Sequence, residues 1–243
     1  MSLLVFDMET RVDKALLRAV QFRGQGLSDD EAYERMRDEL GWATGGDFFP
    51  LTFQVPISIA IGRAGDDCVL QSLDVLGADT LGEAGIVQAF WSRLEECDGT
   101  LVSFNGRGFD LPVLELQALR HGISAPRYFG SERDSLRMRF GRHCDLYDWL
   151  TNGGAARLRG GLDLVAKLVG LPGKGEVSGA DVQVLWERGC WERIHRYCRD
   201  DVLQTYFLYL RIEHLRGRLS GEQLAQVETA TRDYRALLDG DRT

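Results

Sequence analysis

The chain has 243 residues and a formal net charge of −8, from 29 basic and 37 acidic side chains. This balance argues against a protein that coats duplex nucleic acid through a broad basic face, but it suits an enzyme that holds a few terminal phosphates through bound cations. No apolar run approaches the roughly 18 residues of a membrane span, so we expect a globular protein with no membrane partner. The five cysteines lack a CxxC pair and the N-terminus lacks signal-peptide features, which favours the reducing cytoplasm.

The N-terminal part of the chain predicts an antiparallel meander. Residues 2–6 form a short apolar run that leads directly into Asp7 and Glu9. Apolar positions recur through 55–62 and 68–75, and a Gly-Asp-Asp turn separates those two runs.

Residues 11–54 interrupt this meander after its first strand. Ser28 and Glu31 stand at the spacing of a capping box, ahead of apolar residues at helical intervals. We therefore predict an insertion that contains one or two helices.

The rest of the chain alternates helices with short strands. The periodicity of apolar residues predicts elements at 83–96 (helix), 100–104 (strand), 110–122 (helix), 143–146 (strand), 162–169, 181–187, 191–214 and 221–238 (all helices). This order indicates an α/β fold. With no repeat or linker in the sequence, we expect a single domain over 1–243, with a C-terminal helical extension at 215–243.

Asp7 and Glu9 are the first candidate site residues. Side chains two apart in a strand point to the same face, so these two carboxylates lie side by side. Their mutual repulsion is relieved by a divalent cation, and hard oxygen ligands suit Mg²⁺ or Mn²⁺. The alternative is a strand end whose charges are simply solvated.

The second candidate cluster runs from Asn105 to Asp110, where an apolar strand ends and a helix begins after two glycines. The carboxyl end of a strand is where α/β sheets bind their ligands. As the N-cap of that helix, Asp110 would also need no function at all. The glycines do not form a dinucleotide-binding motif, because the third position of GxGxxG falls at Leu111.

The third cluster lies on the long helix at 191–214. Tyr197, Asp201 and Thr205 follow one another at intervals of four, on one stripe of a largely apolar helix. A buried carboxylate there needs a cation or a partner. The alternative reading is that Asp201 makes a structural salt bridge and Tyr197 is a core residue. The order of the three clusters along the chain is the one expected for a single cleft.

Together these motifs resemble the DEDD 3′–5′ exonucleases, and in particular stand-alone relatives of the proofreading domain of family B DNA polymerases. The matching segments are 6–10, 105–110 and 197–201, and the resemblance spans roughly residues 2 to 212. It implies an RNase H-like mixed five-stranded sheet flanked by helices. The insertion after the first strand would then overhang the cleft, where it narrows access or docks a partner.

The third motif fits two registers of this superfamily. One pairs a tyrosine with an aspartate four residues later, here Tyr197 with Asp201, and the other pairs His195 with Asp200, five residues later. In both subfamilies a threonine commonly follows the catalytic aspartate by four residues. Thr205 therefore favours Asp201 and the tyrosine (DEDDy) subfamily.

The resemblance also implies a catalytic set of Asp7, Glu9, Asp110, Tyr197 and Asp201. The four carboxylates would hold two divalent cations, with Asp7 bridging them, Glu9 and Asp201 on the ion that activates water, and Asp110 on the other. Tyr197 would orient the attacking hydroxide, since a tyrosine with its ordinary pKa of about 10 is a poor base at neutral pH. The products would be 5′-mononucleotides.

Contacts to the substrate are also implied by the resemblance. They fall on Met8, Thr10, Asn105, Phe109 and Lys174, with Phe109 as a candidate for stacking on a base or for the core. A weaker supporting role is expected for Asp145. A local basic stretch forms either a phosphate contact or a solvated face, and its members are Arg133, Arg137, Arg139 and Arg142.

The sequence leaves three functions open. The first is a DNA exonuclease acting on single strands or frayed 3′ ends, and the second is an RNA 3′-trimming nuclease of the same superfamily. The third is a catalytically silent binding module. The presence of all four carboxylates and Tyr197 argues against the third.

Overall fold

A computed structural model describes residues 2–240 of the chain except 45–47, 131–141, 174 and 176. Its centre is a five-stranded sheet in the order β3-β2-β1-β4-β5. The strands are β1 (Leu3–Val12), β2 (Gln54–Ala64), β3 (Leu70–Gly77), β4 (Thr100–Ser103) and β5 (His143–Asp145). The first three are antiparallel neighbours, whereas β4 runs parallel to both β1 and β5. The predicted meander and the mixed RNase H-like sheet are confirmed.

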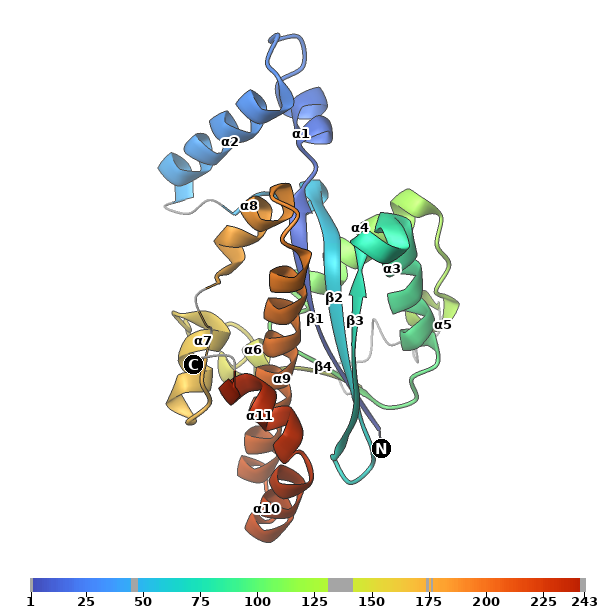
Figure 1. The fold of residues 1–243 in the computed structure, drawn as a ribbon, viewed down its shortest axis with the longest axis vertical. Helices are drawn as coiled ribbons and strands as arrows, with labels where there is room; N and C mark the ends of the chain where they lie inside the picture. The colour runs from blue at the N-terminus through green and yellow to red at the C-terminus, as the bar shows by residue number, and fades with distance from the viewer. Residues whose placement is uncertain (1, 45–47, 131–141, 174, 176, 241–243) are drawn as a thin grey trace.

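Helices cover both faces of this sheet (Figure 1). The long α9 packs on one face, against β1, β2 and β4, while α3 and α4 pack on β2 from the other. The helices are α1 (Lys14–Gln21), α2 (Asp29–Thr44), α3 (Ala78–Glu95), α4 (Asp110–His121), α5 (Pro126–Phe129), α6 (Leu146–Leu150), α7 (Gly161–Leu168), α8 (Val182–Glu187), α9 (Trp191–Leu215), α10 (Gly221–Ala230) and α11 (Arg232–Gly240). No described helix is long and apolar enough to cross a membrane.

Strand β1 divides the core between the two faces. Its residues alternate, so that Leu3 and Val5 lie in the cluster under α9, and Leu4, Phe6 and Met8 lie in the cluster under α3 and α4. The pairing of β1 with β4 covers residues 3–5 and β4 ends at Ser103. The part of β1 after Val5 therefore extends beyond the end of β4, and Asp7 and Glu9 of the predicted site lie in this part.

The insertion forms two helices and a short 3₁₀ turn, η1 (Leu51–Phe53). Ser28 and Glu31 make the predicted capping box, since the backbone amide of each residue donates a hydrogen bond to the side chain of the other. Strand β1 continues to Val12 and so includes the first two residues of the predicted insertion, because Thr10, Arg11 and Val12 pair with β2. Figure 1 shows α1 and α2 beyond the end of the sheet that lies opposite the N-terminus.

The predicted closing helix at 221–238 is wrong in one respect, because it is broken at Thr231 into α10 and α11. The Thr231 hydroxyl is buried and donates a hydrogen bond to the Val227 carbonyl oxygen at 2.7 Å. The break allows both helices to pack against α9, where Leu224 and Leu238 join the core.

Candidate active site

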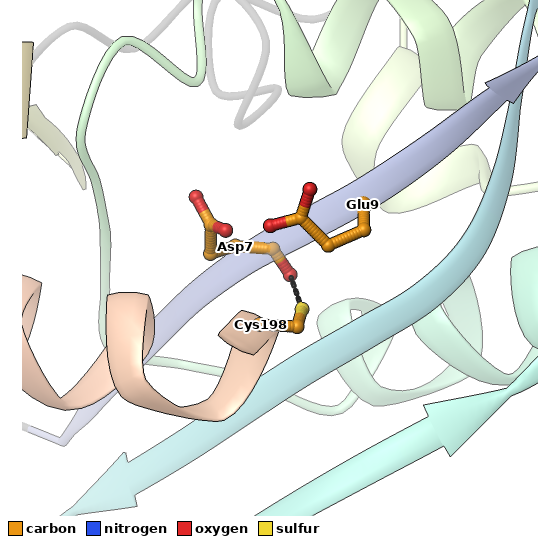
Figure 2. A group of neighbouring side chains, drawn as sticks. All are labelled: Asp7, Glu9 and Cys198. Atoms are coloured by element: carbon orange, nitrogen blue, oxygen red, sulfur yellow. Dashed lines mark hydrogen bonds between the residues drawn. The ribbon is translucent and has the colours of Figure 1, made fainter. Parts of the chain in front are cut away.

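Asp7 and Glu9 project from the same face of β1, as their spacing predicts. Among the residues that the structure describes, they form one group with Cys198 of α9, in which one donor atom from each lies within 4.8 Å of the others (Figure 2). Glu9 is only 8% exposed and Asp7 is half-buried. The two carboxylates therefore meet at a largely desolvated spot between β1 and α9, where uncompensated negative charge is costly.

Cys198 was not predicted from the sequence to lie at this site. Its thiol donates weak hydrogen bonds to the backbone oxygens of Asp7, at 3.4 Å, and Ser58, at 3.7 Å. Burial raises the pKa of the Cys198 thiol well above its usual range, and the charges of Asp7 and Glu9 raise it further. The thiol is therefore a neutral packing group that fixes α9 against β1 directly below Asp7. Its place three residues before Asp201, on the same helix face, was the available signal.

Asp110 is the most perturbed carboxylate of the site. Burial raises the pKa of Asp110 to about 7, and the charges of Asp145 and Asp201 add to this shift. Hydrogen bonds from the backbone amides of Asp110 and Met8 act in the opposite direction. The Met8 amide lies between Asp7 and Glu9 in β1, so this bond ties Asp110 to the carboxylate pair.

Asp110 is the first residue of α4 and not its N-cap, because Phe109 occupies the cap position without a side-chain bond. The alternative of a simple capping role for Asp110 is therefore wrong. Its Oδ1 is buried and has no hydrogen-bond partner among the described residues. An unpaired buried carboxylate oxygen is costly in a purely structural role and suits a cation ligand.

The turn before Asp110 is built by Asn105 and Asp145. Asn105 adopts a left-handed conformation with φ of 65°. Buried Asp145 accepts hydrogen bonds from the backbone amides of Asn105 and Arg107, each at 2.8 Å. The supporting role predicted for Asp145 therefore has a geometric basis: its carboxylate holds the loop that leads to Asp110.

Gly106 is needed in this turn because a side chain would collide with a buried strand. A Cβ atom there would lie 2.6 Å from the Cβ of Ser103. Overpacking of this kind costs about 1–3 kcal/mol. We predict that Gly106→Ala lowers the free energy of unfolding by that amount, seen as a lower denaturant midpoint, and slows nucleotide release by displacing Asp110.

Gly108→Ala is the matched control for this prediction. A Cβ at residue 108 would meet the end of the Asn105 side chain, at 2.5 Å, and that exposed amide can rotate away. Equal denaturant midpoints for the two variants would contradict the prediction.

Arg107 and His143 form a second layer behind the turn. The Arg107 guanidinium donates to His143 Nδ1 at 3.3 Å, to the His143 carbonyl at 2.8 Å and to Asp148 at 3.3 Å. Burial lowers the pKa of His143 to about 3, with the Arg107 charge as a second cause. His143 is therefore neutral at physiological pH and bonds Ser103 Oγ through Nε2, at 2.8 Å.

The third motif places Tyr197, Asp201 and Thr205 on the buried side of α9, at 6%, 4% and 0% exposure. Gln204 Nε2 lies 3.5 Å from Asp201 Oδ1, and Asp201 is close enough to Asp110 to raise its pKa. The side chain of Tyr197 packs with apolar residues of β2 and α8.

The competing register points elsewhere. His195 Nδ1 lies 3.0 Å from Ser58 Oγ, and His195 Nε2 lies 3.1 Å from Asp79 at the start of α3. Asp200 is 24% exposed and is bonded by Arg199 at 2.7 Å. This geometry favours Asp201 as the aspartate that belongs to the site.

The structure separates the predicted substrate contacts. Met8 is 4% exposed and its side chain packs under α3 and α4, on the face of β1 opposite to Asp7. The Met8 side chain therefore does not reach Asp7 or Glu9. The Thr10 hydroxyl donates to Gln54 at 2.8 Å. Asn105 is exposed and Phe109 is half-buried at the start of α4. Four other predicted residues lie outside the described part of the chain: Arg133, Arg137, Arg139 and Lys174.

Asp7, Glu9, Asp110 and Asp201 fit divalent cations, because each offers a carboxylate oxygen, which is a hard ligand. The Oδ1 of Asp110 is buried and has no hydrogen-bond partner in the part of the chain that the structure describes. Asp110 and Asp201 stand outside the tight group of Asp7, Glu9 and Cys198. Four like charges converge fully only when cations offset their repulsion.

Fold and site together define an RNase H-like protein with an acidic centre on the part of β1 that extends beyond β4. Residues 46–241 match a family described as a predicted 3′–5′ exonuclease related to the exonuclease domain of PolB, and the chain belongs to this family. The expectation of a 3′–5′ exonuclease is thereby confirmed. The matched segment includes Asp110, Tyr197 and Asp201 but begins after Asp7 and Glu9, which the fold adds to the site through β1.

One solved structure similar to this chain is that of exonuclease I, described as suggesting how processivity is achieved. The two are 15% identical over 90% of this chain and 46% of exonuclease I, with a TM-score of 0.39. This chain thus spans about half the length of exonuclease I, and so loose a superposition transfers no activity. No curated protein matches the chain.

Proposed function

We propose that this exonuclease hydrolyses single-stranded or frayed DNA from its 3′ end with two divalent cations, Mg²⁺ or Mn²⁺, and releases 5′-mononucleotides. The observation that carries the proposal is the pair of Asp7 and Glu9, whose oxygens converge within 4.8 Å, with Asp110 bonded to the backbone between them. The family's relation to the exonuclease domain of PolB supports DNA as the substrate.

In this proposal Asp7, Glu9, Asp110 and Asp201 hold the cations. Cations bound there would supply the positive charge that stabilises the attacking and leaving oxygens of an in-line displacement. The site desolvates its carboxylates, and this strengthens their electrostatic interaction with a cation relative to bulk water. Tyr197 orients the attacking water by a hydrogen bond.

The proposal is tested with matched oligonucleotides of DNA and RNA, labelled at either end and incubated with Mg²⁺ or Mn²⁺. We expect a 5′-labelled DNA strand to shorten into a ladder and a 3′-labelled strand to release labelled mononucleotide at once. Asp7→Ala should remove this activity, while Asp233→Ala, whose side chain is 96% exposed on α11, should retain it.

Two results would overturn parts of this proposal. Activity that survives in Asp7→Ala would remove the carboxylate pair from the catalytic site. Faster shortening of RNA than of DNA would replace DNA by RNA as the substrate and leave the site assignment unchanged.

A further inference from the structure

We propose that Phe48, a residue of the insertion, stacks on an unpaired base near the 3′ end of the substrate, together with Phe109. The inference rests on the proposed function and adds to it a residue that selects single-stranded ends. It makes the insertion a part of the substrate-binding site.

The first observation is where the end of the insertion lies. Gln117 of α4 donates to the Gln54 carbonyl at 2.9 Å, and Leu51 packs among the apolar residues under α4. Six residues before Gln54, Phe48 contacts Phe109, which immediately precedes α4. Segment 48–54 therefore lies along α4, with Phe48 at the helix end that carries Asp110 and Gln54 beside Gln117.

The second observation is how firmly this segment is held. Phe49 is 4% exposed and stacks on Tyr33 of α2, with ring centroids 4.8 Å apart and planes within 5°. Gln54 bonds both the Phe49 carbonyl, at 3.2 Å, and the Thr10 hydroxyl of β1. Phe49 thus anchors this end of the insertion, directly next to Phe48.

The third observation is the exposure of the aromatic pair. Phe48 is 64% exposed, and its ring centroid lies 5.2 Å from that of half-buried Phe109, with planes at 65°. Phe109 directly precedes Asp110 and packs against the core under α3 and α4, so the pair stands beside the start of the helix that carries Asp110. A large apolar ring left in water there suits a ligand with a flat apolar face, and every nucleobase has one.

Charge argues that this part of the insertion does not bind phosphates. Helix α2 carries six acidic and two basic residues. A phosphate backbone is repelled there, so stacking supplies the affinity at this point of the path. Paired bases are stacked on one another, and a base must leave its duplex to reach Phe48.

The test measures binding of a fluorescent single-stranded oligonucleotide by anisotropy, with Ca²⁺ as the only divalent cation. Stacking of one base is worth about 1–3 kcal/mol, so we expect Phe48→Ala to weaken binding about 5- to 150-fold and Phe48→Trp to restore it. Leu119→Ala, which removes an 81% exposed side chain of α4, should bind as the wild type does.

A scan with one abasic site at each of the last four nucleotides distinguishes stacking from loss of structure. In the wild type, one abasic position should cost at least as much affinity as Phe48→Ala, and the same abasic position should cost clearly less in the variant than in the wild type. Equal binding by wild type and Phe48→Ala, or additive losses, would overturn the inference. A wild type that degrades no oligonucleotide with Mg²⁺ or Mn²⁺ would instead contradict the proposed function, so the two failures are distinguishable.

Discussion

Replacement of Asp201 by asparagine should lower the rate of nucleotide release by more than about 100-fold. Even partners that only support a metal ligand contribute about 10- to 100-fold to affinity or activity, and Asp201 is proposed as a ligand itself. The side chain is 4% exposed and lies close enough to Asp110 to raise its pKa. An amide of the same shape removes the charge with little change in packing.

Asp200→Asn is the matched control, one residue away on the same helix. Asp200 is 24% exposed and is bonded by its neighbour Arg199, and a partly solvated ion pair between neighbouring residues contributes little to stability. We expect Asp200→Asn to keep nearly full activity. The measurement is single-turnover release of mononucleotide, with denaturant midpoints to confirm that both variants fold.

The same comparison can be made between Tyr197, which we propose orients the attacking water, and His195, its counterpart in the other register. Tyr197→Phe should lower the rate, while His195→Ala, which breaks contacts to Ser58 and Asp79, should affect stability more than rate. Loss of activity in Asp200→Asn and His195→Ala, with activity kept in Asp201→Asn and Tyr197→Phe, would reverse the register.

Local patterns in the sequence predicted much of the scaffold of this site. The period of two in β1 placed Asp7 and Glu9 together, and Gly122, which is left-handed, ends α4 as expected. The same period also puts Met8 on the opposite face, so its predicted role as a substrate contact overlooked a signal that was present.

What the sequence did not predict depends on contacts between distant elements. Cys198 meets Asp7 only because α9 crosses β1 at that point, and Phe48 meets Phe109 only because the insertion returns along α4. The break at Thr231 depends on how two helices pack against a third. No local periodicity contains these relations.

The second large effect is expected from Asp110, which should make the free energy of unfolding of the cation-free protein depend on pH. Burial raises the pKa of Asp110 to about 7 from its ordinary value of 3.8, so the folded protein keeps this proton at a higher pH than the unfolded chain does. Between these values the folded state binds more protons, so this group's contribution to the free energy of unfolding falls as the pH rises and is lost above pH 7. The difference corresponds to at most about 4 kcal/mol.

His143 acts in the opposite direction, and the comparison must allow for it. Its pKa is lowered from 6.5 to about 3, so its contribution to stability is lost as the pH falls below 6.5. Wild type and Asp110→Asn share His143, and the difference between their unfolding free energies isolates Asp110. In EDTA we expect the variant to gain stability relative to the wild type from pH 5 to pH 8, measured by urea unfolding.

Cation binding should release the proton that Asp110 holds. At pH 6 an ion that takes Asp110 as a ligand must displace about one proton, and at pH 8 almost none, so affinity should fall below pH 7. Calorimetry with Mn²⁺ in two buffers of different ionisation enthalpy measures this release. Asp110→Asn should release no such proton at either pH. If both proteins give the same proton count and parallel stability curves, Asp110 titrates with an ordinary pKa and the proposal that it is a buried cation ligand fails.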